Sequence, residues 1–179
     1  ANNPADMLEA QAAIAGPLLA SQSALILNNR TGEVLYQKNM NRVMPIASIS
    51  KLMSAMVTLD ARLNMNEVIT ITEDEIDRIK GTGSRLSIGT QLTRAQLLHL
   101  SLMSSENRAT HALGRTYPGG MAAFVAAMNA KAQSLGMADS RFYEPTGLDY
   151  RNVSTASDLS KMVAAAAKYP QIRRNSTST

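Results

Sequence analysis

The most informative segment of the chain is Pro45-Ile46-Ala47-Ser48-Ile49-Ser50-Lys51-Leu52-Met53-Ser54-Ala55-Met56-Val57. It has the form of a loop that continues into a helix, and from Ile49 onward its apolar residues cover most of the helix circumference. A helix that is apolar nearly all round is a buried one. Charge returns only at Asp60 and Arg62. We therefore expect the rest of the chain to pack around this helix.

Lys51 is the exceptional residue of this helix, because a lysine is almost never fully buried without a partner. Ser48 precedes it by three residues and so lies on the same helical face. Burial disfavours the charged ammonium, which lowers the pKa of a lysine and makes its amine a usable proton acceptor. A serine beside such an amine can lose its proton as it attacks a carbonyl. The spacing also fits a serine N-cap followed by a lysine that extends to solvent.

The composition narrows the class of protein. The 179 residues are 45% hydrophobic and 18% charged, which suits one good core or two small lobes. Cys 0 excludes disulfides, thiolate metal sites and cysteine nucleophiles. The net charge of +4 comes from scattered basic residues and only 4% of residues are aromatic, so nucleic-acid binding is not expected. The positive charge is compatible with affinity for an anionic polymer such as cell wall. No apolar run approaches the roughly 18 residues of a membrane span.

Apolar periodicity and turn residues predict the order of elements. The predicted helices cover residues 6–15, the Lys51 helix, a helix opened by a capping box at 93–96, and 108–115, 121–135 and 156–168; the predicted strands are 23–27, 33–37, 67–72 and 85–88. Gly136 is the expected C′ residue of the helix 121–135. Residues 80–83 are expected to form a turn and not a phosphate cradle, since no helix opens directly after them.

The predicted hairpin of residues 23–37 cannot form a stable sheet alone, because roughly three or more strands are needed. Nothing after residue 150 is predicted to supply further strands, and the chain finishes in a polar run, 175–179. We therefore expect this chain to be the N-terminal part of a longer protein, whose remaining piece carries the rest of the sheet.

A second motif is Ser105-Glu106-Asn107, the only Ser-x-Asn of the chain, between two predicted helices. With Ser48 and Lys51 it resembles the penicilloyl serine transferases, which combine Ser-x-x-Lys, Ser-x-Asn and a later Lys-Thr-Gly. Further stretches are similar to the low-molecular-mass penicillin-binding proteins, most closely the D-alanyl-D-alanine endopeptidase subgroup of the penicillin-binding protein 7 type. They include Leu-Met-Ser-Ser-Glu-Asn-Arg-Ala, Tyr-Pro-Gly-Gly, Ala-Met-Asn-Ala-Lys-Ala, Glu-Pro-Thr-Gly-Leu-Asp and Ser-Thr-Ala-Ser-Asp-Leu. The similarity covers roughly residues 20–175.

The resemblance implies an α+β fold of the β-lactamase/transpeptidase type. One lobe would be an antiparallel sheet flanked by helices, built here by residues 20–66 and 150–179 and incomplete without C-terminal strands. The other would be a mainly helical lobe, 67–149, that is inserted after the Lys51 helix and carries the Ser-x-Asn motif. Residues 1–19 would form an N-terminal helix or extension, and the active site would lie between the lobes.

The resemblance also implies the chemistry. Ser48 would be the acylated nucleophile, Lys51 its general base and Ser105 a proton relay, while Asn107 would bind the substrate amide. The Ser48 backbone N–H, at a helix start, suits one side of an oxyanion hole. The family's activity is serine D,D-peptidase cleavage of peptidoglycan stem peptides, with β-lactams as covalent inhibitors and no cofactor. Its location is the periplasm, after removal of a signal peptide.

The sequence departs from the family pattern in one respect: no Lys-Thr-Gly follows Asn107. Residues 80–83 do not replace it, because they precede the Ser-x-Asn motif, so we expect the 179-residue piece alone to be poorly active. The alternatives are a non-catalytic wall-binding or penicillin-sensing domain, a D,D-carboxypeptidase, or a β-lactamase. A β-lactamase would need a glutamate that activates water, and Glu144 is the nearest candidate. His99 and His111 are expected to be structural histidines rather than metal ligands.

Overall fold

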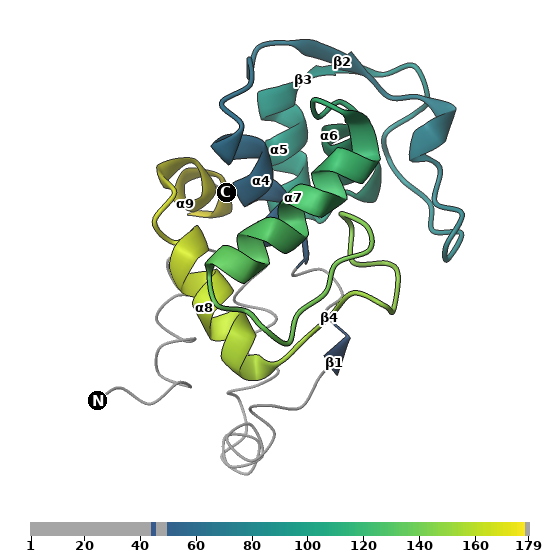
Figure 1. The fold of residues 1–179 in the computed structure, drawn as a ribbon. Coiled ribbons are helices and arrows are strands. Elements are labelled where there is room, and N and C mark those ends of the chain that lie inside the picture. Colours follow the sequence, from purple (N-terminus) through teal and green to yellow (C-terminus); the bar gives the residue numbers. More distant parts are fainter. Residues whose placement is uncertain (1–43, 46–49, 178–179) are drawn as a thin grey trace.

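A computed structural model describes residues 44–45 and 50–177 of the chain (Figure 1). The predicted helix 6–15, the predicted hairpin 23–37 and Ser48 lie outside these residues. Within them the architecture is a set of helices with two short antiparallel strand pairs. In Figure 1 the pair β2–β3 is at the top and the pair β1–β4 at the lower right, with the helices between them.

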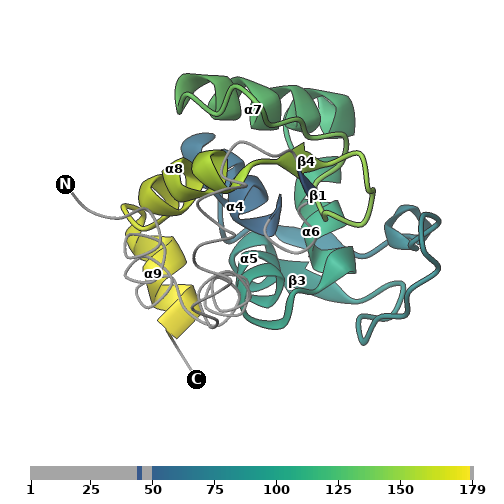
Figure 2. The ribbon, with the colours of Figure 1, turned by 90° about the horizontal axis from the view of Figure 1, so that it is seen from below.

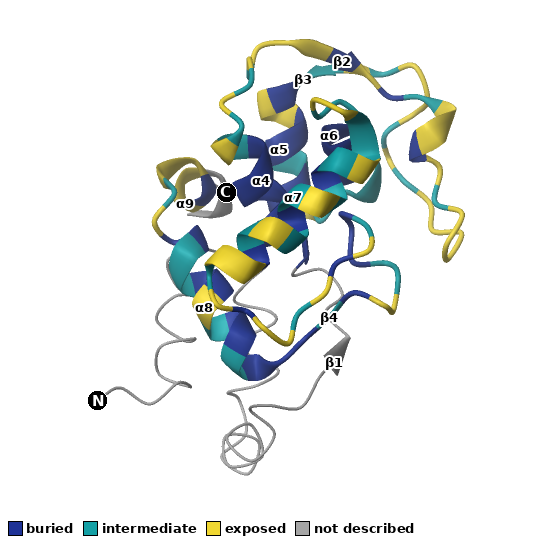
Figure 3. Ribbon diagram, in the orientation of Figure 1, coloured by how far each residue is buried: buried dark blue, intermediate teal, exposed yellow. Residues whose placement is uncertain are grey.

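Helix α4 (Ser50–Asp60) is the central element, as its apolar sequence predicts. Every residue from Ser50 to Thr58 is buried. Helices α5, α6, α7 and α8 all contact it, and Figures 1 and 2 show it enclosed among them. The burial colouring of Figure 3 is correspondingly dark along α4 and mixed along the outer helix α7. The chain therefore folds around the helix that carries Lys51.

The helices that follow have the predicted limits to within a residue or two. Helix α5 is Arg94–Ser104, α6 is Asn107–Arg115 and α7 is Gly120–Ser134. The predicted capping box is present, because Thr93 Oγ1 accepts from the Gln96 amide at 3.1 Å and Gln96 Oε1 accepts from the Thr93 amide at 2.8 Å. Gly136, just past α7, has a φ of +77°, which a glycine adopts without strain.

The strand prediction is right at one place and wrong at another. Strand β2 (Val68–Thr70) falls within the predicted 67–72 and pairs with β3 (Gln91–Thr93). No strand forms at 85–88, because the ladder stops at Gly89, whose amide donates to the Ile71 carbonyl at 2.7 Å. The chain then turns away, and the Leu86 carbonyl accepts instead from the Arg108 guanidinium at 2.8 Å.

The expectation that nothing after residue 150 supplies a strand is also wrong. Strand β4 (Val153–Ser154) pairs antiparallel with β1 (Met44–Pro45), Met44 opposite Ser154. Two residues are too short to show as an alternating pattern in sequence. The pair brings the segment before α4 next to the segment before α8, and so helps to place the start of α4.

The chain ends with two helices. Helix α8 (Ala156–Ala166) begins at the predicted residue, and Thr155 caps it, its Oγ1 accepting from the Asp158 amide at 3.1 Å. Helix α9 (Pro170–Thr177) lies beyond the last predicted helix, 156–168, and was not predicted. Proline fits the first turn of a helix, where its missing N–H costs no hydrogen bond. Ile172 anchors α9 in the core, with none of its surface exposed.

One hydrophobic core joins these elements, and methionines, whose unbranched side chains fit irregular gaps, help to fill it. Among the described residues, the buried methionines are Met53, Met56, Met128, Met137 and Met162. They pack with the largest buried apolar side chains, Phe124, Phe142, Leu52, Ile71, Leu97, Leu98 and Leu102. Within the described ranges, no helix is long and apolar enough to cross a membrane.

Candidate active site

Lys51 lies in the first turn of α4 with only 3% of its surface exposed. Its Nζ donates a hydrogen bond to the backbone carbonyl of Thr146 at 3.0 Å. Burial lowers the Lys51 pKa from 10.5 to about 8, and the attraction of the Glu144 and Glu106 carboxylates opposes that effect only in part. The amine therefore loses its proton close to neutral pH, as a general base must.

Residues 144–149, the Glu144 turn, present the Thr146 carbonyl to Lys51. The turn closes around its own first side chain: Glu144 Oε2 accepts from the Thr146 amide at 2.7 Å and also from the Thr146 hydroxyl. Glu144 Oε1 accepts from the amides of Gly147 at 2.6 Å and Asp149 at 3.2 Å. Gly147 has a φ of +86°, which would strain any residue with a side chain.

Buried polar side chains fasten this turn to α4. Ser54 Oγ donates to the Pro145 carbonyl at 2.7 Å. Asn152 Nδ2 donates to the Glu144 carbonyl at 2.8 Å and to Ser50 Oγ at 3.2 Å. Ser50, Ser54 and Asn152 have no exposed surface. Buried polar groups are costly unless they are hydrogen-bonded, and here the loop carbonyls and the side chains of α4 satisfy one another.

The Ser-x-Asn motif forms the junction between α5 and α6. Ser105 ends α5 in the left-handed conformation, with a φ of +51° that is uncommon for a residue other than glycine. Glu106 caps α6, its Oε1 accepting from the Arg108 amide at 3.0 Å and from the Ser84 hydroxyl at 2.6 Å. Asn107 is the first residue of α6. The two helices thereby hold the motif on a rigid corner.

Ser105 and Asn107 each bring a buried polar atom to this corner. Among the described residues, Ser105 Oγ and Asn107 Oδ1 have no hydrogen-bond partner. Most buried polar side-chain atoms in proteins are paired, so an unpaired one needs an explanation. Groups that must bind a substrate or pass on a proton are such an explanation, because their partners arrive with the substrate.

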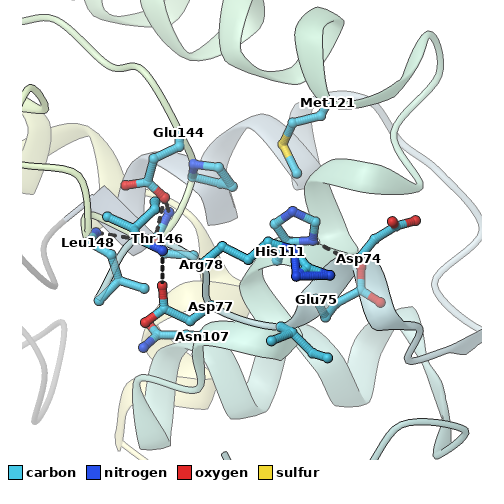
Figure 4. A pocket seen from close by; sticks show the side chains of 13 residues that line it. Asp74, Glu75, Asp77, Arg78, Asn107, His111, Met121, Glu144, Thr146 and Leu148 are labelled. Atoms are coloured by element: carbon cyan, nitrogen blue, oxygen red, sulfur yellow. Dashed lines mark hydrogen bonds and ion pairs between the residues drawn. The ribbon is translucent and has the colours of Figure 1, made fainter. Parts of the chain in front are cut away.

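A cavity of about 240 Å³ opens beside Asn107 and Thr146. Figure 4 shows Asn107, Thr146 and Leu148 on one side of it, with His111 and Glu75 on the other. Further lining residues are the apolar Ile76, Ile79, Met121 and Pro145 and the charged Asp74, Asp77, Arg78 and Glu144. A second cavity, of about 800 Å³, is lined by the whole Ser-x-Asn motif and by residues 83–86.

An ion-pair network forms the far wall of the smaller cavity. Glu75 is 3% exposed and accepts from Arg115 Nε at 2.6 Å; its Oε1 also lies 2.9 Å from His111 Nδ1. Together with the Thr72 amide at 2.6 Å, these groups lower the Glu75 pKa to about 2 against the effect of burial. His111 thus has a structural partner. In the described part of the chain, no group of three or more metal-ligating side chains gathers.

The structure describes three of the four predicted site residues: Lys51, Ser105 and Asn107. Asn107 lines the same cavity as Thr146, whose carbonyl accepts from Lys51 Nζ, so the Ser-x-Asn corner lies near the buried amine. Sequence reasoning missed the Thr146 carbonyl and Asn152 as parts of the site. The Pro-Thr-Gly of the Glu144 turn was a signal for a tight turn, but nothing local indicated that this turn meets α4, about 90 residues earlier in the chain.

The fold defines the class of protein. The Streptomyces K15 DD-transpeptidase superposes on this chain with a TM-score of 0.67 at 27% identity, covering 74% of this chain and 55% of that one. This likeness confirms the predicted α+β, transpeptidase-like fold.

Sequence similarity then defines the family. A D-alanyl-D-alanine endopeptidase of Pseudomonas aeruginosa is 52% identical over 159 residues, which is 89% of this chain and 51% of that protein. One of Escherichia coli is 50% identical over 161 residues, 90% of this chain and 52% of that protein. The family of D-alanyl-D-alanine carboxypeptidases, peptidase S11, matches residues 10–179, and the chain belongs to it. The chain spans about half the length of these curated relatives.

Proposed function

We propose that this protein is a serine D,D-peptidase that cleaves peptidoglycan stem peptides through an acyl-enzyme on Ser48. The observation that carries the proposal is the buried Lys51 amine, which donates to Thr146, a residue that lines one cavity together with Asn107 of the Ser-x-Asn corner. Burial lowers the pKa of this amine to about 8. The names of the relatives favour a D-alanyl-D-alanine endopeptidase, which cuts cross-links, over a carboxypeptidase.

The proposed reaction gives each of the four residues a separate role. The neutral Lys51 amine takes the proton of the Ser48 hydroxyl as Oγ forms a bond to the carbonyl carbon of a D-alanyl residue. The Thr146 carbonyl and the nearby carboxylates stabilise the resulting ammonium. Ser105 passes the proton to the leaving nitrogen as the C–N bond breaks, while the Asn107 amide holds the substrate. Water then hydrolyses the ester and restores the Ser48 hydroxyl.

The smaller cavity is where we place the stem peptide, because it opens directly beside Asn107 and Thr146. β-Lactams would acylate Ser48 as substrate mimics, and the periplasm, where peptidoglycan lies, is the proposed location. We also propose the two-lobe division: 20–66 with 150–179, the inserted 67–149, and the extension 1–19.

A β-lactamase fits the site less well. Such an enzyme needs a carboxylate free to activate water over the ester. Both oxygens of Glu144 instead accept hydrogen bonds from the amides of its own turn. This carboxylate is therefore engaged by the backbone of its turn and is not free to activate water. The acyl-enzyme formed with a β-lactam should consequently be long-lived.

The deciding experiment is mass spectrometry after incubation with a labelled penicillin. It is run on the 179-residue chain and on the complete gene product, with Ser48→Ala as the control. We expect an adduct on Ser48 in the complete gene product, none in Ser48→Ala, and little in the 179-residue chain. Absence of an adduct from both forms contradicts the proposal. The rates at which a cross-linked peptide dimer and a single pentapeptide are cleaved then separate an endopeptidase from a carboxypeptidase. Failure to cleave either substrate points to a penicillin-sensing domain.

A further inference from the structure

The Glu144 turn connects a carboxylate to the buried amine through one backbone carbonyl. Glu144 Oε2 accepts from the Thr146 amide at 2.7 Å, and the carbonyl of the same residue accepts from Lys51 Nζ at 3.0 Å. The neighbouring Pro145 carbonyl accepts from Ser54, one helical turn after Lys51. Two successive carbonyls of the turn therefore face two successive donors on the same side of α4.

We propose that Glu144 is a positioning residue for Lys51: its carboxylate folds the turn so that the Thr146 carbonyl fixes the amine where it can accept a proton. The inference rests on the proposed role of Lys51 as the general base. Glu144 itself does not contact the reacting atoms in this account, and it acts only through the turn.

A lysine needs such support, because its stem has four rotatable bonds and its ammonium can donate in three directions. The Thr146 carbonyl takes one N–H and thereby orients the remaining valences of nitrogen. A carbonyl is a neutral acceptor, so it orients the amine without holding the full positive charge that a directly bonded carboxylate would favour. The Glu144 charge reaches Lys51 only as an attraction, whose effect on the Lys51 pKa is smaller than that of burial.

The turn requires a carboxylate rather than an amide at position 144. Five donors converge on its two oxygens: the amides of Thr146, Gly147 and Asp149, the hydroxyl of Thr146 and the side-chain amide of Asn152. A carboxylate accepts at both oxygens. A glutamine would turn an NH₂ group toward at least one of these donors, so Glu144→Gln should open the turn while keeping its size.

The sign of a pH shift distinguishes positioning from a simple charge effect. In the described part of the chain, Glu144 and Glu106 are the carboxylates that attract Lys51, and burial has the larger influence on its pKa. If Glu144 acted only as a charge, its removal would lower the Lys51 pKa further. If it holds the turn, opening the turn admits water to the amine and raises the pKa toward the usual lysine value.

The experiment measures the acylation rate constant for a labelled penicillin from pH 5 to pH 10, together with hydrogen exchange of peptides covering 142–152, in the complete gene product. The variants are Glu144→Gln, Ser54→Ala and Lys51→Met. The matched control is Asp158→Asn: Asp158 is a 3% exposed carboxylate that also holds a loop, accepting from the Asp139 amide at 2.9 Å and from Ser140 Oγ at 2.8 Å. It bonds to neither the Glu144 turn nor Lys51.

For Glu144→Gln we expect faster hydrogen exchange in 142–152 and a plateau acylation rate constant at least tenfold lower. The acid limb of the pH–rate profile should shift to higher pH by ~0.5 pH unit or more. Asp158→Asn should keep the wild-type profile. Ser54→Ala, which loosens the turn without changing a charge, should shift the limb the same way by less, and it decides the matter if Glu144→Gln fails to fold. An unshifted or downward-shifted limb, or unchanged exchange, overturns the inference. Undiminished acylation in Lys51→Met instead overturns the proposed role of Lys51 itself.

Discussion

Lys51 and Glu75 are each only 3% exposed. The pKa of Lys51 moves toward neutral pH, whereas the pKa of Glu75 moves away from it. The Lys51 pKa falls from 10.5 to about 8, so this charge is easily lost. The Glu75 pKa falls from 4.5 to about 2, so this charge is locked in place. Equal burial thus produces one titratable group and one permanent ion.

The partners explain the difference. Glu75 accepts from Arg115 at 2.6 Å, lies 2.9 Å from His111, and accepts from the Thr72 amide at 2.6 Å, and these interactions outweigh its desolvation. Lys51 has a neutral carbonyl at 3.0 Å, and the carboxylates that attract it are not bonded to it. A buried charge with ionic partners is suited to holding a wall of the site, whereas one with a neutral partner is suited to proton transfer.

Lys51→Met should have the largest effect. Loss of a general base lowers the acylation rate by about 10²–10⁴-fold. The free energy of unfolding at pH 7 should change by no more than about 1 kcal/mol, since the variant loses a bond to Thr146 but no longer buries a charge. Acylation kinetics and urea unfolding of the same preparation check both values. A stability loss without an activity loss would make Lys51 a structural ion like Glu75.

Glu75→Gln should have the opposite profile. Because its folded pKa lies below the unfolded value, Glu75 contributes stability that is present above pH 4.5 and is lost as the pH falls toward about 2. We expect the variant to lose about 2–3 kcal/mol at pH 7, with the gap from wild type closing between those pH values. Urea unfolding at pH 7 and pH 3 measures it, and a gap that is equally large at both contradicts the ion-pair account. The acid limb of acylation should keep its midpoint.

The pH dependence of stability in alkali should show Lys51 directly. The unfolded chain holds this proton more tightly than the folded one, so wild type should gain stability relative to Lys51→Met as the pH rises from 8 toward 10.5. Over the accessible part of that range the gain should be about 1–2 kcal/mol. A constant difference between the two proteins from pH 7 to pH 10 would mean that Lys51 is not desolvated in solution.

His111→Ala should have the smallest effect. It removes one of the interactions with Glu75 and leaves both contacts with Arg115, at 2.6 and 3.3 Å. A single hydrogen bond of a partly exposed side chain contributes about 1 kcal/mol. Thermal or urea unfolding at pH 7 is sufficient to measure it. A loss as large as that of Glu75→Gln would show that the histidine, and not the arginine, holds the Glu75 charge.

Local signals predicted much of the helical structure. The capping residues Thr93 and Thr155 and the C′ residue Gly136 interact with groups only a few residues away, so the sequence alone indicates such helix ends. The failures at 85–88, at β4 and at α9 have a common cause. Each depends on a partner far along the chain: Ile71 for the end of the β2–β3 ladder, β1 for β4, and the core for Ile172.

Apolar periodicity and motif spacing are local properties, so the sequence alone predicted that α4 is buried, that a lysine lies on it, and that a Ser-x-Asn motif stands between two helices. The surroundings of Lys51 could not be predicted in this way, because they depend on the tertiary fold. Lys51 and Ser54 of α4 donate to the carbonyls of Thr146 and Pro145, and Asn152 donates to Ser50. These hydrogen bonds join segments about 90–100 residues apart in the chain. The pKa of a buried amine is set by its spatial neighbours, and those are properties of the fold.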